Sequence, residues 1–404
     1  MGASRWVLLS LLAVTITLAL SSVGGALANP SPQPVAAHNP SWVDSIQFHQ
    51  LIEKKYYPRA SSATTLTSVG AVAVSVLVLL NGSEQIVLFN AERDSTTIVQ
   101  AVVPGGANAF VVTELAAGGN FFVEFENALS GAFFYEEISP TGVMSTPPLP
   151  IPLNYYWTIV AGNANTLFAS SLGGLVSINP WTFEVRANYS SLIPPLVTVT
   201  SVLADGRLLY IAGDQTVGSG GLTPFYGFID KVTSTETTLS PSASTGPSDL
   251  DGTIFAIGEA NGNVYFGGQL ALFEVSPVYF ATVVEGYLFE YSPHSGVVTN
   301  LSSLDPISKW GVYAIFDLGP TIGMTISQYV LTATGSTEAS GTYVLAPSHA
   351  RLINDTRLTG DDFVTVADQT SLSAGLLFVG GTDTVSGAAE IAAVPAFLFL
   401  LGIR

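Results

Sequence analysis

Short apolar runs that end in small residues or a glycine pair recur along the chain roughly every 45 to 50 residues. The clearest copies lie at Leu208–Gly213, Val264–Gly268 and Leu376–Gly381. They are rich in β-branched and aromatic residues, and Gly, Pro, Asn or Ser separates them from the next run, which is the pattern of β-strands between turns. The sequence therefore predicts many short strands joined by tight turns.

A repeat of this length is typical of one blade of a β-propeller, a four-stranded antiparallel sheet that packs on its two neighbours. Continuous apolar runs such as 71–78 fit inner strands that are buried on both faces. We predict an all-β fold, a β-propeller of seven four-stranded blades, at 65–104, 105–152, 153–195, 196–245, 246–306, 307–358 and 359–404. The structural alternatives are two packed β-sandwiches and an outer-membrane-type barrel, which would need alternating rather than continuous apolar positions.

Residues 1–28 have the form of a secretory signal peptide. Arg5 supplies the positive charge, Trp6–Leu20 the apolar core, and Ala26–Ala28 the small-x-small cleavage site. The apolar core is shorter than the ~20 residues that a spanning helix needs, which favours cleavage over an uncleaved anchor. The mature chain is then expected outside the cell or on its surface, without a transmembrane span.

The rest of the chain divides into two parts. Residues 29–64 are predicted to form a lead segment, with helical character around Trp42–Tyr57, and residues 65–404 to form the propeller domain.

The chain carries 30 Asp and Glu against 12 Lys and Arg, for a formal net charge of −18. This excess argues against nucleic acid as a partner, because phosphates need clustered cations, and against anionic membrane surfaces. Only 10% of the residues are charged, compared with about 25% in an average soluble protein, which raises the hypothesis of an acidic habitat in which carboxylates lose their charge. The absence of cysteine excludes disulfides and thiolate metal sites.

Four Asn-x-Ser/Thr triplets occur in the sequence. Together with a signal peptide they predict a glycosylated outer surface. The acceptor residues would be Asn81, Asn188, Asn300 and Asn354.

Three stretches carry a resemblance to known proteins: Tyr287–Pro293, Val298–Leu304 and Lys309–Ile315. Together they look like a repeat of secreted archaeal proteins. The glycine pairs that close the runs at 264–268 and 376–381 also resemble kelch-type propeller blades. Most runs lack the Tyr and Trp that kelch blades place at fixed distances after the glycines. The resemblance therefore implies a secreted, kelch-like β-propeller and leaves its activity open.

Two pairs of carboxylates are the candidate catalytic residues. Glu124 and Glu126 lie two apart in a predicted strand and so share one face; such a pair performs glycoside hydrolysis at a suitable separation, and its alternative role is a solvated outer strand. Asp249 and Asp251 lie where loops open onto one face of a propeller. They could bind calcium, but the later ligands of a calcium loop are missing, so a turn is the alternative. No histidine spacing indicates a metal site, and no cofactor is predicted.

We predict a binding scaffold that presents loops to a protein or a glycan, rather than an enzyme. An extracellular hydrolase with carboxylates at the central channel is one alternative, and a surface-layer or filament component is another. Several acids that converge at one channel mouth with shifted pKa values would favour the hydrolase. A channel lined by Val, Ala and Gly would favour the scaffold.

Overall fold

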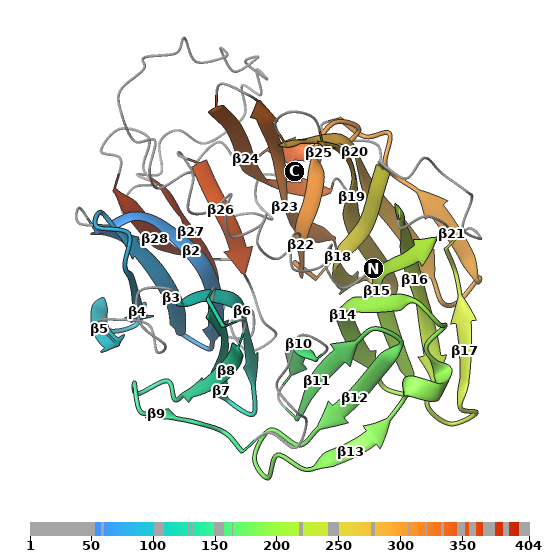
Figure 1. Ribbon diagram of the computed structural model, residues 1–404, viewed down its shortest axis with the longest axis horizontal. Helices are drawn as coiled ribbons and strands as arrows, with labels where there is room; N and C mark the ends of the chain where they lie inside the picture. Colours follow the sequence, from blue (N-terminus) through green and yellow to red (C-terminus); the bar gives the residue numbers. More distant parts are fainter. Residues whose placement is uncertain are drawn as a thin grey trace.

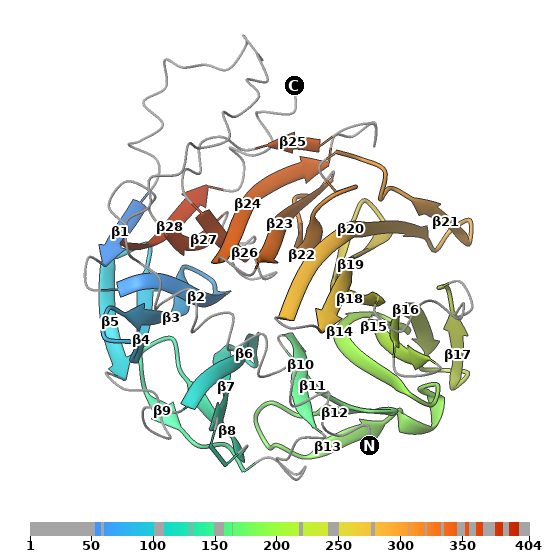
Figure 2. The same ribbon diagram turned by 45° about the horizontal axis from the view of Figure 1, so that its top comes forward.

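The structure is a computed structural model, and β-sheets in it form a ring around a central axis (Figures 1 and 2). The fold is the predicted all-β β-propeller. The described residues are 53–57, 60–100, 109–127, 129–130, 132–148, 157–163, 165–217, 221–240, 250–275, 279–305, 307–319, 321–332, 335–345, 352–354, 361–366, 376–382 and 388–395. The predicted signal peptide lies outside these residues. Among them there is no helix with the length and apolarity of a membrane span.

Four antiparallel sheets contain four strands each. The first has β2 (Ala60–Val69), β3 (Val72–Leu79), β4 (Glu84–Asn90) and β5 (Ser95–Gln100); the second has β6 (Ala109–Ala117), β7 (Asn120–Asn127), β8 (Ala132–Ile138) and β9 (Met144–Ser145). The third has β10 (Thr158–Asn163), β11 (Thr166–Ser171), β12 (Gly174–Ile178) and β13 (Val185–Asn188). The fourth has β26 (Asp361–Val366), β27 (Leu376–Thr382), β28 (Ala389–Pro395) and β1 (Glu53–Tyr57).

The strands β14 to β25 form one twelve-stranded sheet. Two single residue pairs, Leu222 with Asp251 and Thr282 with Val330, join three four-stranded antiparallel runs within it. The sequence predicted seven separate four-stranded blades. The described strands instead form four separate four-stranded sheets and this one large sheet. The strands are β14 (Val197–Asp205), β15 (Leu208–Val217), β16 (Gly221–Asp230), β17 (Thr235–Thr238), β18 (Leu250–Ala260), β19 (Asn263–Val275), β20 (Tyr279–Ser292), β21 (Val297–Asn300), β22 (Gly311–Asp317), β23 (Ile322–Thr332), β24 (Gly335–Leu345) and β25 (Leu352–Asn354).

The N-terminal strand β1 closes the ring. It pairs with β28 as the outermost strand of the last sheet, from Glu53 opposite Ala393 to Tyr57 opposite Ala389. The prediction of helical character is therefore wrong for residues 53–57, because pairing with the open edge of β28 decides their conformation. The sheets also begin earlier than residue 65, since β2 starts at Ala60. The first half of β2 is rich in Ser and Thr and lacks the apolar run by which the other strands were predicted.

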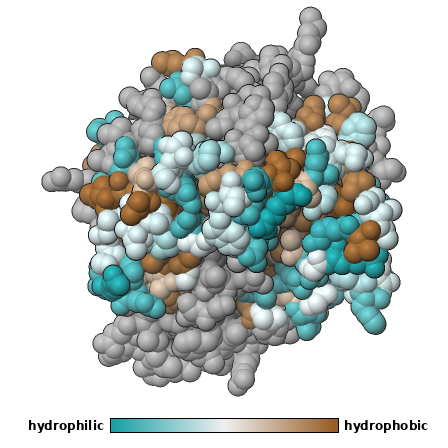
Figure 3. Space-filling view, turned by 90° about the horizontal axis from the view of Figure 1, so that it is seen from below, coloured by the Kyte–Doolittle hydropathy of each residue, from teal (hydrophilic) through white to brown (hydrophobic). Residues whose placement is uncertain are grey.

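The core lies between neighbouring sheets. Val74 and Val76 on one face of β3 pack with Phe125 of the second sheet, while Leu77 on the opposite face packs with Phe378 of the last sheet. Burial of a side chain of this size contributes about 1.5–3 kcal/mol. The continuous apolar runs thus have the role that the sequence predicted. The outer strands are exposed instead, and Figure 3 shows apolar and polar patches mixed on one side of the molecule.

The turn between the third and fourth strands of several sets has one common form. Its first residue, such as Asn179 or Asp230, accepts backbone N–H groups two and three positions later through its side-chain oxygen. Its last residue is left-handed, with φ of 58° at Phe183, 54° at Ser234 and 69° at Gly296. This repeated turn fixes where each outer strand begins.

Candidate functional site

The predicted pair Glu124 and Glu126 lies on one face of β7, as the period of a strand requires. Glu124 has no exposed surface and Glu126 is 5% exposed, so the solvated alternative is wrong for this pair. The face that carries them packs against the third sheet, where Phe122 and Tyr135 meet Ile159 of β10. A substrate in solvent has no access to Glu124.

Glu124 is held by a short network. The Tyr135 hydroxyl donates a hydrogen bond of 2.5 Å to Glu124 Oε1, and the backbone N–H of Ile159 also bonds to this carboxyl group. Burial raises the pKa of Glu124 to about 8, because it outweighs these two bonds, and the nearby Glu126 raises the pKa further. Burial also raises the pKa of Glu126. The Glu124 carboxyl is therefore mostly protonated at neutral pH, which a buried carboxyl without a cation requires.

The second predicted pair lies at a junction of the large sheet. Asp251 belongs to β18, where it pairs with Ala271 of β19 and with Leu222 of β16. Asp249 lies outside the described residues. Among the described residues there is no group of three or more His, Asp or Glu placed to hold a metal ion.

The predicted acceptor asparagines have related positions. Asn188, Asn300 and Asn354 are the last residues of the outer strands β13, β21 and β25, and Asn81 lies in the exposed turn after β3. The N–H of Ser190 donates to Asn188 Oδ1 at 2.9 Å, and the N–H of Ser302 donates to Asn300 Oδ1 at 2.8 Å. The serine hydroxyls in turn accept the N–H of Leu175 and of Leu288. The Asn-x-Ser triplets at Asn188 and Asn300 thus also fasten the outer strand to its neighbour.

Sequence analysis missed a third group of carboxylates, at the ends of three successive inner strands. Asp205 ends β14, Glu259 is the penultimate residue of β18, and Asp317 ends β22. We call Asp205, Glu259 and Asp317 the strand-end trio. The pKa of Glu259 is raised first by burial and then by the charges of Asp205 and Asp317. Three side chains, each from a different repeat, therefore share one electrostatic environment beside the axis of the ring (Figure 2).

Close packing of the inner strands brings this trio together. Gly258, next to Glu259, has no room for a Cβ atom, which would overlap Ile315 of β22. Asp205 and Asp317 are exposed, and Glu259 is half-buried. The cation in the same turn as Asp205, Arg207, donates from Nε to Asp230 Oδ1 at 2.7 Å, and this pairing lowers the pKa of Asp230. Because Arg207 pairs with Asp230, it does not neutralise the carboxylates of the trio.

A buried phenol adjoins the trio. Tyr210 of β15 has no exposed surface, and its hydroxyl has no hydrogen-bond partner among the described residues. Burial raises its pKa first, followed by the charges of Asp205, Tyr291 and Glu259, so the hydroxyl lies within electrostatic reach of two members of the trio. An unpaired buried hydroxyl costs about 1–3 kcal/mol.

The inner strands of the first three sheets lack such acids. β2, β6 and β10 end in Val69, Ala117 and Asn163. Among the described inner strands, those of the large sheet therefore end in or next to an acid, whereas those of the first three sheets do not. The sequence signal for the trio is an acid one to three residues before a turn glycine, at Gly206, Gly262 and Gly319. All three glycines have positive φ. The sequence does not show that these turns are neighbours, because their proximity depends on closure of the ring.

Comparison with known proteins supports the fold. No family model matches the chain, and no curated protein matches it. The β-propeller domain of the Trilobed protease from Pyrococcus furiosus is 9% identical, with a TM-score of 0.50 over 83% of this chain and 94% of that domain. YCF48 bound to D1 peptide is 10% identical, with a TM-score of 0.50 over 85% of this chain and 96% of that structure.

A third similar structure is much longer than this chain. The extracellular domain of a one-component system from B. thetaiotaomicron is 12% identical, with a TM-score of 0.49 over 83% of this chain. The chain spans only 38% of the length of that structure. At these identities the similarities establish the β-propeller fold and nothing about ligands.

Proposed function

We propose that this protein is an extracellular binding scaffold that holds a positively charged segment of a partner protein at the strand-end trio. The observation that supports this most directly is the convergence of Asp205, Glu259 and Asp317 from three successive repeats. Carboxylates near one another repel, and an incoming lysine or arginine reduces that repulsion because its charge is opposite to theirs.

The remaining features agree with this proposal. The form of residues 1–28 supports export, and the Asn-x-Ser/Thr triplets support N-linked glycans at Asn81, Asn188, Asn300 and Asn354. Three of these four asparagines end outer strands, so glycans there would leave the strand-end trio open. YCF48, a protein of this fold, is bound to a D1 peptide in its structure.

Calorimetric titration with hexalysine tests the proposal. We expect the wild type to bind this peptide and the triple variant Asp205→Asn, Glu259→Gln, Asp317→Asn to bind it about tenfold more weakly, because each ion pair contributes about 0.2–1 kcal/mol. The matched control carries Glu92→Gln, Glu184→Gln and Glu236→Gln, which remove the same charge from turns and an outer strand. Equal weakening by both triple variants would show a response to net charge alone and would contradict the proposal.

A hydrolase is the second candidate, and one observation favours it. Glu259 has a raised pKa between two carboxylates, which is the environment of a general acid. Turnover of aryl glycosides by the wild type, abolished by Glu259→Gln, would support this candidate over a scaffold.

A further inference from the structure

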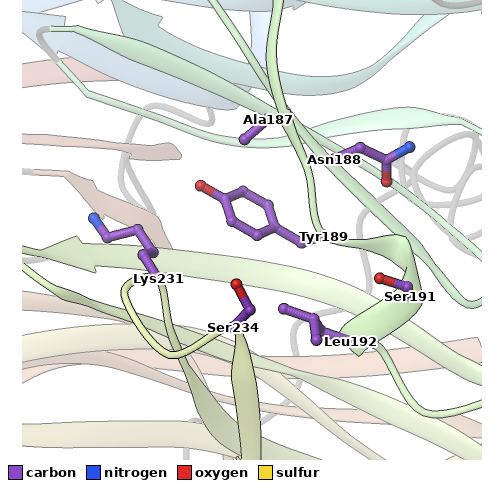
Figure 4. Close-up of a pocket in the computed structure, with 7 residues that line it drawn as sticks. All are labelled: Ala187, Asn188, Tyr189, Ser191, Leu192, Lys231 and Ser234. Carbon is purple, nitrogen blue, oxygen red and sulfur yellow. The ribbon is translucent and has the colours of Figure 1, made fainter.

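A pocket of about 290 Å³ lies at the outer rim, away from the strand-end trio (Figure 4). One wall is the end of β13 with the following 3-10 turn η2 (Ser190–Leu192), and the other is the turn between β16 and β17. Its volume is near the lower limit of about 300 Å³ for small-molecule sites, which fits one ring rather than a long chain.

The polar groups of the pocket are one cation, several hydroxyls and one amide. Lys231 provides an ammonium group, and Tyr189 and Ser234 provide hydroxyls; Figure 4 shows the Tyr189 hydroxyl and the Lys231 amine on the same side of the pocket. No carboxylate lines it, and no carboxylate of the described residues forms an ion pair with Lys231. Asp230, the neighbour of Lys231, is engaged by Arg207. The pocket therefore offers one cation and no acid to an anionic group, in a chain with 30 acids and 12 basic residues.

The pocket also contains apolar groups. The ring of Tyr189 lies in the middle of the pocket, with Leu192 and Ala187 next to it (Figure 4). An aromatic ring with adjacent aliphatic groups suits the C–H face of a sugar ring. The pocket therefore combines a place for an anionic group with a place for a pyranose.

Backbone hydrogen bonds hold both walls in position. The N–H of Tyr189 donates to the Leu175 carbonyl, and the N–H of Leu192 donates to the Tyr189 carbonyl, each at 2.8 Å. On the other wall the N–H of Lys231 donates to the Arg207 carbonyl at 3.1 Å, and the N–H of Ser234 donates to the Asp230 carbonyl at 2.8 Å. These bonds fix the walls before a ligand arrives, which lowers the entropy cost of binding.

We propose that this pocket binds a carboxylated sugar, a uronic acid either free or at the end of a glycan. The carboxylate receives hydrogen bonds from Lys231 and Tyr189, and the ring lies against Tyr189 and Leu192. This site is independent of the strand-end trio, so it does not rest on the function proposed for those carboxylates.

Saturation-transfer NMR tests this proposal with the full chain from a bacterial host, in which Asn188, one of the residues that line the pocket, carries no glycan. The probes are glucuronate, a tri-galacturonate, glucose and acetate. We expect glucuronate to bind and glucose and acetate to bind at least about tenfold more weakly, since each lacks one half of the recognition. Tighter binding of tri-galacturonate than of glucuronate would indicate a glycan end, and equal binding a free sugar; both support the site.

Two variants locate the binding. Lys231→Gln is expected to weaken glucuronate binding about tenfold or more, because it removes a charged hydrogen bond, and Tyr189→Phe to weaken it less. Lys309→Gln, at an exposed lysine beside Asp305, is the matched control and should change nothing. Absence of glucuronate binding at millimolar concentration, equal binding of acetate or glucose, or an unchanged affinity in Lys231→Gln would each overturn the proposal.

Discussion

Two groups of carboxylates in this propeller show how the same chemical group takes opposite roles. Glu124 and Glu126 are buried between the second and third sheets, whereas Asp205, Glu259 and Asp317 meet beside the axis with two of their members exposed. Glu124 has a phenol and a backbone amide as partners and no cation. The trio has neighbouring charges of its own sign. Burial keeps the Glu124 carboxyl mostly protonated within the core, whereas two members of the trio are open to solvent.

The buried carboxylates make the stability of the folded protein depend on pH. Raised pKa values at Glu124, Glu126, Glu136 and Glu259 all have burial as their largest cause. Each such group holds its proton more tightly in the folded chain than in the unfolded chain, so acid favours the folded state.

The largest effect is expected at Glu124. Its pKa of about 8 in the folded protein is above the ordinary value of 4.5. The stabilisation is therefore complete below pH 4.5 and is lost as the pH rises through about 8, a change on the order of 5 kcal/mol. Urea unfolding between pH 4 and 9 should show this decline, and Glu124→Gln should remove most of the slope because an amide does not titrate.

A matched control separates this slope from the effect of net charge. Glu92→Gln removes one carboxylate from an exposed turn and should leave the slope as in the wild type. If Glu124→Gln retained the full decline between pH 5 and 8, the buried acid would not be its source.

The next effect concerns the phenol that supports Glu124. Tyr135→Phe keeps the packing of the ring against Ile159 and Leu167 and removes the hydrogen bond to Glu124. We expect a loss of about 1–3 kcal/mol in the free energy of unfolding at pH 6, because a buried carboxyl oxygen then lacks its donor. Tyr343→Phe is the control: its ring is similarly buried, in a different cluster. Equal losses in the two variants would show that the bond to Glu124 has no special weight.

The sequence predicted the strands better than the contacts between residues of different sheets. The runs at 208–213, 264–268 and 376–381 lie in β15, β19 and β27. These strands could be predicted because the residues that form a buried strand and its turns are consecutive in the sequence. The shared face of Glu124 and Glu126 followed from the period of two, but their burial depends on the third sheet. The strand-end trio depends on closure of the ring, which places residues one repeat apart beside each other. β1 was missed for the same reason, since its partner is at the other end of the chain.

The smallest effect is expected at Glu259, and it sharpens the contrast with Glu124. Glu259→Gln removes a charge that Asp205 and Asp317 oppose, so it should relieve repulsion and change the free energy of unfolding by less than about 1 kcal/mol at pH 7. Because solvent and salt screen these charges, the difference from the wild type should shrink further at 1 M salt, where the screening length is about 3 Å. Urea unfolding at low and high salt measures both quantities. A loss as large as that caused by Tyr135→Phe would mean that Glu259 is part of the core, and the distinction between a buried pair and a trio open to solvent would fail.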